Sequence, residues 1–211
     1  MRIGILGTGG MADALGTQWA RAGHEVMISG RNPDKAAALA AKLTTARTGT
    51  WAQAAEFGDV VLAALPVEAL REVLQAAGPA LRDKPLIDVA NGAGPDAYDP
   101  ARPIADMVRE ITGARVVKAF NLGHVDVWRM TPPVFGGRPL AVPLCGDDEE
   151  ALAAVRHLVT DLGCTPVDGG GLRRARLLEA TAAFVIGLWF GGVDAQAILT
   201  PQGAAGVPLS V

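Results

Sequence analysis

The sequence predicts an α/β fold in which helices cover both faces of a mostly parallel sheet. Three observations predict it. Short runs rich in Ile, Val and Leu alternate with Ala-rich segments of helical period, Gly makes up 26 of the 211 residues, and 50% of the chain is hydrophobic. Buried parallel strands are continuous apolar runs, and the chain returns between them through helices. This length makes one large domain, or one domain with a modest appendage.

The first part of the chain contains six such runs and the helical segments between them. Strands are predicted near residues 2–6, 24–29, 47–49, 59–65, 85–89 and 115–120, and helices near 10–22, 34–45, 51–57, 67–77 and 101–112. Asn32 can cap a helix that begins at Pro33. Gly23 and Gly113 stand where helices need a left-handed residue to end. These signals predict a doubly wound sheet.

The pattern changes after about residue 130. The turn residues TPPVFGGRP precede a predicted strand in LAVPLCG. DDEEALAAVRHLVTDLG then opens with four acids, which the dipole of a helix N-terminus favours. A last strand in CTPVDGG leads into LRRARLLEATAAFVIGLWFGG, a helix that is apolar on nearly all sides in its second half. We therefore expect a first domain over residues 1–130 and a small C-terminal α/β extension over residues 131–211 that completes the sheet.

Composition and charge exclude several classes of protein. The 19 Lys and Arg residues against 22 Asp and Glu give a net charge of −3, too acidic for nonspecific attraction to nucleic acid. Cys145 and Cys164 are too few for a disulfide framework and lack metal-ligand spacing, so we expect two buried thiols, no metal and a cytoplasmic location. No signal peptide is expected, and the uncharged residues 180–193 fall short of the ~20 that a membrane span needs.

The strongest motif is the glycine-rich segment RIGILGTGGMADALG, in which Gly7-x-Gly9-x-x-Ala12 follows the first strand and opens a helix. Gly7 permits the turn, Gly9 lets the backbone approach a pyrophosphate, and Ala12 allows the helix to contact the strand. The amides expected to bind the pyrophosphate are those of Thr8, Gly9, Gly10 and Met11. In this strand–turn–helix context the motif predicts a Rossmann-type dinucleotide site.

The end of the second strand favours NADP over NAD. An NAD enzyme usually has Asp or Glu at this place, but here the strand ends in SGRNPDK with no acid at its end. Arg31 can give a forked pair of donors to a 2′-phosphate, and Lys35 can add a compact charge. Ser29 and Asn32 can add hydrogen bonds.

Further candidates follow the later strands, because ligands lie outside the carboxyl ends of parallel strands. They are Ala64, Leu65 and Pro66 after the fourth strand, Asn91 after the fifth, and Asn121 and His124 after the sixth. Asn91 could bond to the nicotinamide ribose and Asn121 to the carboxamide. His124 could donate to a carbonyl of the acceptor or supply a proton, or it could be an exposed helix cap. The turns after the fourth and fifth strands need no ligand, so a purely structural role stays open for them.

The sequence also disfavours some competing enzymes. The only tyrosine, Tyr98, has Arg102 rather than Lys four residues later, unlike short-chain dehydrogenases, and no lysine follows Lys118, unlike hydroxyacid dehydrogenases of the related glycine-rich type.

The last helix allows two interpretations. Arg176 and Glu179, three residues apart, are expected to form an intrahelical ion pair. Trp189 and Phe190 could wall a flat ring, but an apolar stripe of this kind also suits a subunit interface. His24 and His157 are expected to be structural.

Several segments resemble the NADPH-dependent reductases of coenzyme F-420 and related dinucleotide-binding reductases. They are GILGTGGMA, SGRNPDKA, VVLAALPVEAL, VVKAFN, CGDDEEA and GGGLRRARLLEA, and they span most of the chain. The resemblance implies that Thr8, Gly9, Gly10 and Met11 hold the pyrophosphate and that Gly30, Arg31 and Lys35 surround the 2′-phosphate. It also implies direct hydride transfer between NADPH and a second planar ring.

The sequence therefore predicts a cytoplasmic NADP(H)-dependent oxidoreductase that forms a homodimer through its final helix. Its small-molecule redox partner is expected to be coenzyme F-420 or a flavin-like acceptor. Two alternatives stay open: reduction of a small imine or carbonyl substrate, and an NADPH-binding sensor without turnover.

Overall fold

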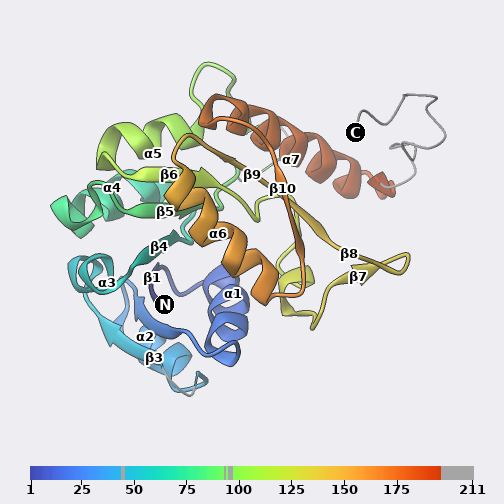
Figure 1. Ribbon diagram of the computed structural model, residues 1–211. Coiled ribbons are helices and arrows are strands. Elements are labelled where there is room, and N and C mark those ends of the chain that lie inside the picture. Colours follow the sequence, from blue (N-terminus) through green and yellow to red (C-terminus); the bar gives the residue numbers. More distant parts are fainter. Residues whose placement is uncertain (44–45, 93, 95–96, 196–211) are drawn as a thin grey trace.

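The computed structural model describes residues 1–43, 46–92, 94 and 97–195, and its centre is one eight-stranded sheet (Figure 1). The strand order is β10-β9-β6-β5-β4-β1-β2-β3. The strands are β1 (Arg2–Leu6), β2 (Glu25–Ser29), β3 (Ala46–Gly49), β4 (Val60–Ala63), β5 (Pro85–Asp88), β6 (Arg115–Lys118), β9 (Ala141–Gly146) and β10 (Thr165–Asp168). Strands β1 to β6 are parallel to one another, whereas β9 pairs antiparallel with β6 and parallel with β10. The predicted α/β class with a mostly parallel sheet is confirmed.

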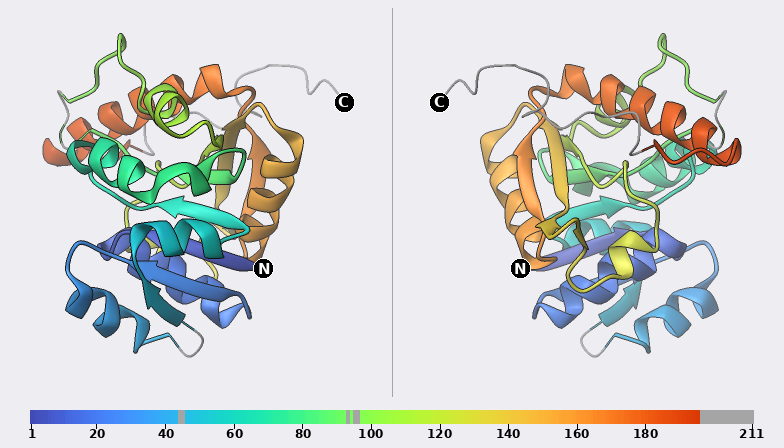
Figure 2. Two further views of the ribbon diagram at one scale, coloured as in Figure 1. Left: turned by 90° about the vertical axis from the view of Figure 1, so that its left-hand side faces the viewer. Right: turned by 90° about the vertical axis from the view of Figure 1, so that its right-hand side faces the viewer.

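Helices cover both faces of this sheet, and each face has its own apolar core. The helices are α1 (Gly10–Arg21), α2 (Pro33–Ala40), α3 (Trp51–Phe57), α4 (Val67–Ala77), α5 (Ile104–Thr112), α6 (Glu149–Asp161) and α7 (Ala175–Phe190). Helices α1, α2 and α6 pack in one core, while α3, α4, α5 and the start of α7 pack in the other. Helix α7 lies at the end of the molecule opposite to α2 and β3 (Figure 2).

Local chemistry sets several helix ends as the sequence predicts. The side chain of Asn32 accepts hydrogen bonds from the first amides of α2, and Gly113 ends α5 with a left-handed φ of 63°. Asp148 caps α6, with Glu149 and Glu150 in its first turn. The helix expected over residues 101–112 begins later, at Ile104. The helix expected to reach residue 45 ends at Ala40, and residues 44–45 lie outside the described residues.

The segment after residue 130 contains one element that the sequence did not predict. The expected turn at TPPVFGGRP forms a small antiparallel hairpin of β7 (Val134–Phe135) and β8 (Arg138–Pro139). Gly136 and Gly137 at its tip have φ values of 57° and 75°, which suit a tight hairpin turn. Short 3-10 helices η1 (Gly78–Leu81), η2 (Val127–Arg129) and η3 (Leu172–Arg174) complete the elements. The domain boundary near residue 130 stays a prediction.

Both cysteines are buried, as expected, and unpaired. Burial raises the pKa of the Cys164 thiol to about 11, so this side chain behaves as a small apolar group. No helix in the described part of the chain has the length and apolar character to cross a membrane.

The close packing of α3 on β1 depends on Gly4. A Cβ at this position would lie 2.0 Å from the carbonyl oxygen of Ala54, a backbone atom that cannot move aside cheaply. We therefore expect Gly4→Ala to lower the free energy of unfolding by about 1–3 kcal/mol in urea titrations. The control is Gly9→Ala, because an added Cβ there meets no atom within 4 Å. Equal stability of the two variants would contradict this packing.

Candidate functional site

The turn between β1 and α1 is held rigidly and leaves open space beside Gly9. Gly7 has a φ of 133°, and its amide donates to the carbonyl of Ser29 over 2.9 Å. A Cβ at Gly7 would lie 2.2 Å from the carbonyl oxygen of Ala64, so the turn is wedged between the ends of β2 and β4. Gly9 caps α1 without a side-chain hydrogen bond. The first amides of α1 therefore have no side-chain cap, an arrangement that suits an anion at a helix N-terminus.

A hollow of about 430 Å³ lies at the carboxyl ends of β1, β2 and β4. Its walls include eight of the residues predicted to bind the dinucleotide, namely Gly7, Thr8, Gly9, Gly30, Arg31, Ala64, Leu65 and Pro66. Arg31 is exposed and forms no ion pair with another described residue. A Cβ at Gly30 would lie 2.5 Å from Cγ2 of Thr8, so a larger residue there would require the side chain of Thr8 to move. Ala12 instead packs in the core beneath the turn.

Two predicted phosphate ligands have other roles in the structure. Ser29 is wholly buried and its Oγ donates to the carbonyl of Ile5 over 2.9 Å, so the expectation that its hydroxyl reaches a 2′-phosphate is wrong. The side-chain oxygen of Asn32 accepts from the amides of Asp34 and Lys35, which leaves its NH2 group as the available donor. Lys35 is exposed on the first turn of α2.

Sequence reasoning missed five residues that line the same hollow. They are Trp51 on α3 and four residues on α4, namely Glu68, Ala69, Glu72 and Val73. Glu68 and Glu72 are four residues apart, which places them on one side of the helix. That spacing was the available signal, but only the packing of α4 shows that this side faces the strand ends.

A second hollow, of about 510 Å³, lies between the ends of β5 and β6 and helix α7. It brings together the predicted Met11, Asn91, Asn121 and His124 with residues of α7. Nδ2 of Asn91 donates to the backbone carbonyl of Asn121 over 2.6 Å, and Nδ2 of Asn121 donates to Oδ1 of Asn91 over 2.9 Å. This reciprocal pair joins the two strand ends and fixes the orientation of both amide side chains.

The segment after β6 has a strained backbone that aromatic rings hold in place. Phe120 has a φ of 61°, which is uncommon for a bulky residue. Its buried ring contacts Trp19 and Trp128 edge to face, with centroids 5.9 and 5.3 Å apart. Trp128 also donates its Nε1 hydrogen to the carbonyl of Gly123 over 3.1 Å and packs where a Cβ of Gly123 would be. These contacts of Phe120 and Trp128 therefore hold in place the segment that carries Asn121.

His124 lines this second hollow but is largely exposed, and its Nδ1 lies 3.3 Å from a carboxylate oxygen of Asp126. Its backbone carbonyl accepts from the amide of Val127, in the turn that precedes η2, whose cap residue is Asp126. The exposure of His124 agrees with the alternative interpretation, but His124 is not the helix cap. The ring can still face a bound molecule.

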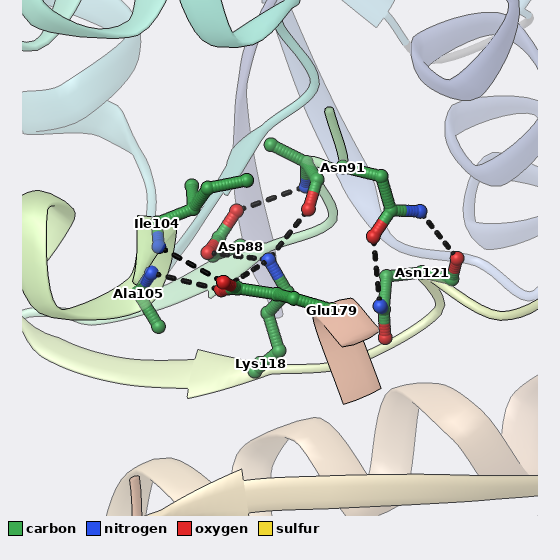
Figure 3. Close-up of polar contacts among 8 residues, drawn as sticks. Asp88, Asn91, Ile104, Ala105, Lys118, Asn121 and Glu179 are labelled. Carbon is green, nitrogen blue, oxygen red and sulfur yellow. Dashed lines mark hydrogen bonds and ion pairs between the residues drawn. The ribbon is translucent and has the colours of Figure 1, made fainter. Parts of the chain in front are cut away.

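A buried ion network lies next to the Asn91–Asn121 pair (Figure 3). Nζ of Lys118 donates to Asp88 over 3.0 Å, to the carbonyl of Ala90 over 2.5 Å and to Glu179 over 3.1 Å. All three charged side chains are almost completely buried. The network joins the ends of β5 and β6 to α7.

Glu179 has a second task in this network, because it caps another helix. Its two carboxylate oxygens accept from the amides of Ile104 and Ala105, while Pro103 at the cap position of α5 offers no side-chain hydrogen bond. The helix N-terminus thus helps to balance the second carboxylate. The expected Arg176–Glu179 pair is wrong. Arg176 instead donates to the carbonyl of Arg173.

His24 has the structural role that the sequence predicts. Its ring bridges the N-terminal amine of Met1 at 3.1 Å and Asp161 at 2.8 Å. His157 is exposed and lies near the same carboxylate, so in the described part of the chain these three side chains bring possible ligand atoms within 4.8 Å of one another. The hydrogen bonds of His24 to Met1 and Asp161 explain why these three side chains lie close together without a metal ion.

Several known proteins are similar to this chain in sequence and in fold. Residues 2–92 match the family model described as NADP oxidoreductase coenzyme F-420-dependent. The F-420-dependent NADP reductase of Methanocaldococcus jannaschii is 30% identical over 210 residues, a match that covers 89% of this chain and 92% of that protein. Metalloreductase STEAP3 of Rattus norvegicus is 30% identical over 190 residues, covering 89% of this chain but 38% of that longer protein. A crystal structure of a candidate F-420-dependent NADP reductase from Arthrobacter sp. fb24 has a TM-score of 0.78 at 26% identity, with 90% of this chain and 95% of that chain covered.

The ion network yields a prediction about stability. Lys118→Met leaves two buried carboxylates without their cation, so we expect the free energy of unfolding to fall by about 3–5 kcal/mol. Glu179→Gln keeps an acceptor for α5 and leaves Lys118 paired with Asp88, so its loss should be about 1–2 kcal/mol. Arg176→Gln on the same helix is the control, with a change below about 0.5 kcal/mol. Urea unfolding measures all three, and equal losses for Lys118→Met and Glu179→Gln would refute this ranking.

Proposed function

Since the chain belongs to the family of coenzyme F-420-dependent NADP oxidoreductases, we propose that it transfers hydride between NADPH and a flat redox ring bound beside α7. The observation that carries this proposal is the position of the start of α1 between two hollows. Gly9 borders the hollow at the ends of β1, β2 and β4, and Met11 borders the hollow beside α7. A dinucleotide with its pyrophosphate at this helix N-terminus would extend one half into each hollow.

The adenosine half of the site favours NADPH over NADH. The end of β2 offers the guanidinium of Arg31, the amine of Lys35 and the NH2 group of Asn32, with no carboxylate on that strand end to repel a phosphate. A forked guanidinium suits a phosphate dianion better than a ribose hydroxyl. These three side chains would surround the 2′-phosphate, and the backbone at Gly30 would pass close to it.

The nicotinamide half is positioned by the amide pair. The side-chain oxygen of Asn121 takes no part in the pair with Asn91, so it can accept a hydrogen bond from the carboxamide of the cofactor. NADPH supplies the hydride when it is bound. The protein needs to align the two rings and exclude water, which requires no catalytic triad. His124 at the edge of the hollow can supply the proton that accompanies the hydride.

The final helix supports two further parts of the proposal. Leu177, Phe184 and Phe190 are exposed apolar side chains on α7, with Phe190 78% exposed. We assign them to the contact with a second copy of the chain in a homodimer. The two buried, unpaired cysteines fit a cytoplasmic enzyme.

The phosphate site can be tested by calorimetry with NADPH and NADH. Arg31→Ala should weaken NADPH binding by about tenfold to a hundredfold, because a charge-assisted pair is lost, and should leave NADH binding nearly unchanged. Gly9→Ala should weaken both cofactors, because the new methyl group occupies the space of the pyrophosphate. Arg156→Ala on α6 is the charge-matched control. An unchanged preference for NADPH in Arg31→Ala would show that the phosphate lies elsewhere.

The reaction itself can be tested by mixing the protein with NADPH and coenzyme F-420. We expect the visible absorbance of the oxidised coenzyme to disappear at a rate proportional to enzyme concentration. Consumption of NADPH with small imines or carbonyls, but not with redox rings, would favour the reductase alternative. Tight binding of NADPH with no oxidation by any acceptor would favour the sensor.

A further inference from the structure

The space beside α7 is larger than the hollow that borders the amide pair. A neighbouring hollow of about 380 Å³ lies between the segment after β6 and the start of β9. The two hollows share residues 121–124 and Trp189, and they are adjacent through these residues. We call the two together the acceptor cleft. Each has the size of a small-molecule site, so the cleft can hold the nicotinamide of the cofactor and, next to it, an acceptor ring of several fused cycles.

The part of the acceptor cleft wall that the structure describes contains no Lys or Arg. Among these described residues, the titratable side chains are those of His124 and Asp194. Asp126 faces the ring of His124 at 3.3 Å. The nearby cation Arg129 is paired with Asp126 at 2.7 Å and with Asp13 at 3.2 Å. The local field is therefore neutral to negative.

The apolar walls instead suit a flat, uncharged ring. Trp189 borders both hollows, and Met11, Val125 and Ile186 surround the part beside the amide pair. An indole favours stacking with another ring. A phosphate or carboxylate moved from water into such walls loses hydration without gaining a partner.

We propose that the acceptor cleft selects an uncharged redox ring, and that the protein provides no binding site for an anionic tail on that ring. This inference rests on the proposed function and names the class of its second substrate. The ring is flavin-like or deazaflavin-like, with its polar edge at His124. The phosphate and carboxylates that coenzyme F-420 carries would remain in solvent.

Pairs of acceptors that share one ring and differ in charge test the proposal. Steady-state kcat/KM is measured with NADPH for riboflavin against flavin mononucleotide, and for the deazaflavin without the phosphate and carboxylate tail against coenzyme F-420. In each pair that is turned over, the member without the anionic tail should react at least as well at low salt, and the ratio should change little with ionic strength. A preference of about tenfold or more for the anionic member that falls with added salt would overturn the proposal. Failure of all four rings, with NADPH binding intact, would overturn the proposed function as well.

A cation added to the cleft gives a second, independent test. Phe135 on β7 lines the smaller hollow and is 39% exposed, so it can be replaced without opening the core. Phe135→Lys should raise the kcat/KM ratio of flavin mononucleotide to riboflavin by about threefold or more at low salt. Phe135→Gln, which is polar but uncharged, is the matched control and should leave that ratio unchanged. An unchanged ratio in Phe135→Lys would contradict the claim that missing cations set the specificity.

Discussion

The arrangement of the site depends on the ion pairs and hydrogen bonds of the buried ammonium of Lys118. Lysine is almost never fully buried without partners, and here two carboxylates and a backbone carbonyl surround it. Asp88 and Lys118 belong to neighbouring strands, whereas Glu179 comes from α7 and also caps α5. Four elements must therefore meet at one point before the charges are satisfied. This requirement places α7, and with it one wall of the acceptor cleft, beside the strand ends.

A second constraint acts on the segment after β6. The left-handed backbone of Phe120 costs on the order of 1–3 kcal/mol, and burial of its ring against Trp19 and Trp128 offsets that cost. The unusual φ turns the chain so that Asn121 faces Asn91. The geometry of the amide pair therefore depends on the packing of Phe120 against Trp19 and Trp128 and on the ion network of Lys118. Both supports exist before any ligand arrives, which is the condition for preorganised binding.

The apolar pattern and the turn residues were sufficient to predict the eight strands of the main sheet and most helix ends, because these depend on neighbours in the sequence. The family was predicted from the resemblance of whole segments, and the β7–β8 hairpin was not predicted. The rule for parallel strand ends also predicted that Asn91, Asn121 and His124 would lie at one edge of the sheet, and they line one hollow. What could not be predicted depends on partners far away in the chain. Ser29 looks like a strand-end ligand, but its hydroxyl faces Ile5 across the sheet. Glu179 looks like a partner for Arg176, but its own partners lie on β6 and α5.

The cofactor half and the acceptor half of the site are formed by different parts of the structure. The cofactor half is built on turns and caps of β1, β2 and β4, so its local sequence already indicates the ligand. The acceptor half is built on α7, and an apolar helix has the same sequence pattern whether it lines a cleft or a dimer contact. Helix α7 is anchored near its start by Ala175 and Glu179, which are buried, whereas Trp189 and Phe190 near its end are exposed. Substitutions at that end can therefore change which ring is accepted while the cofactor half keeps its geometry.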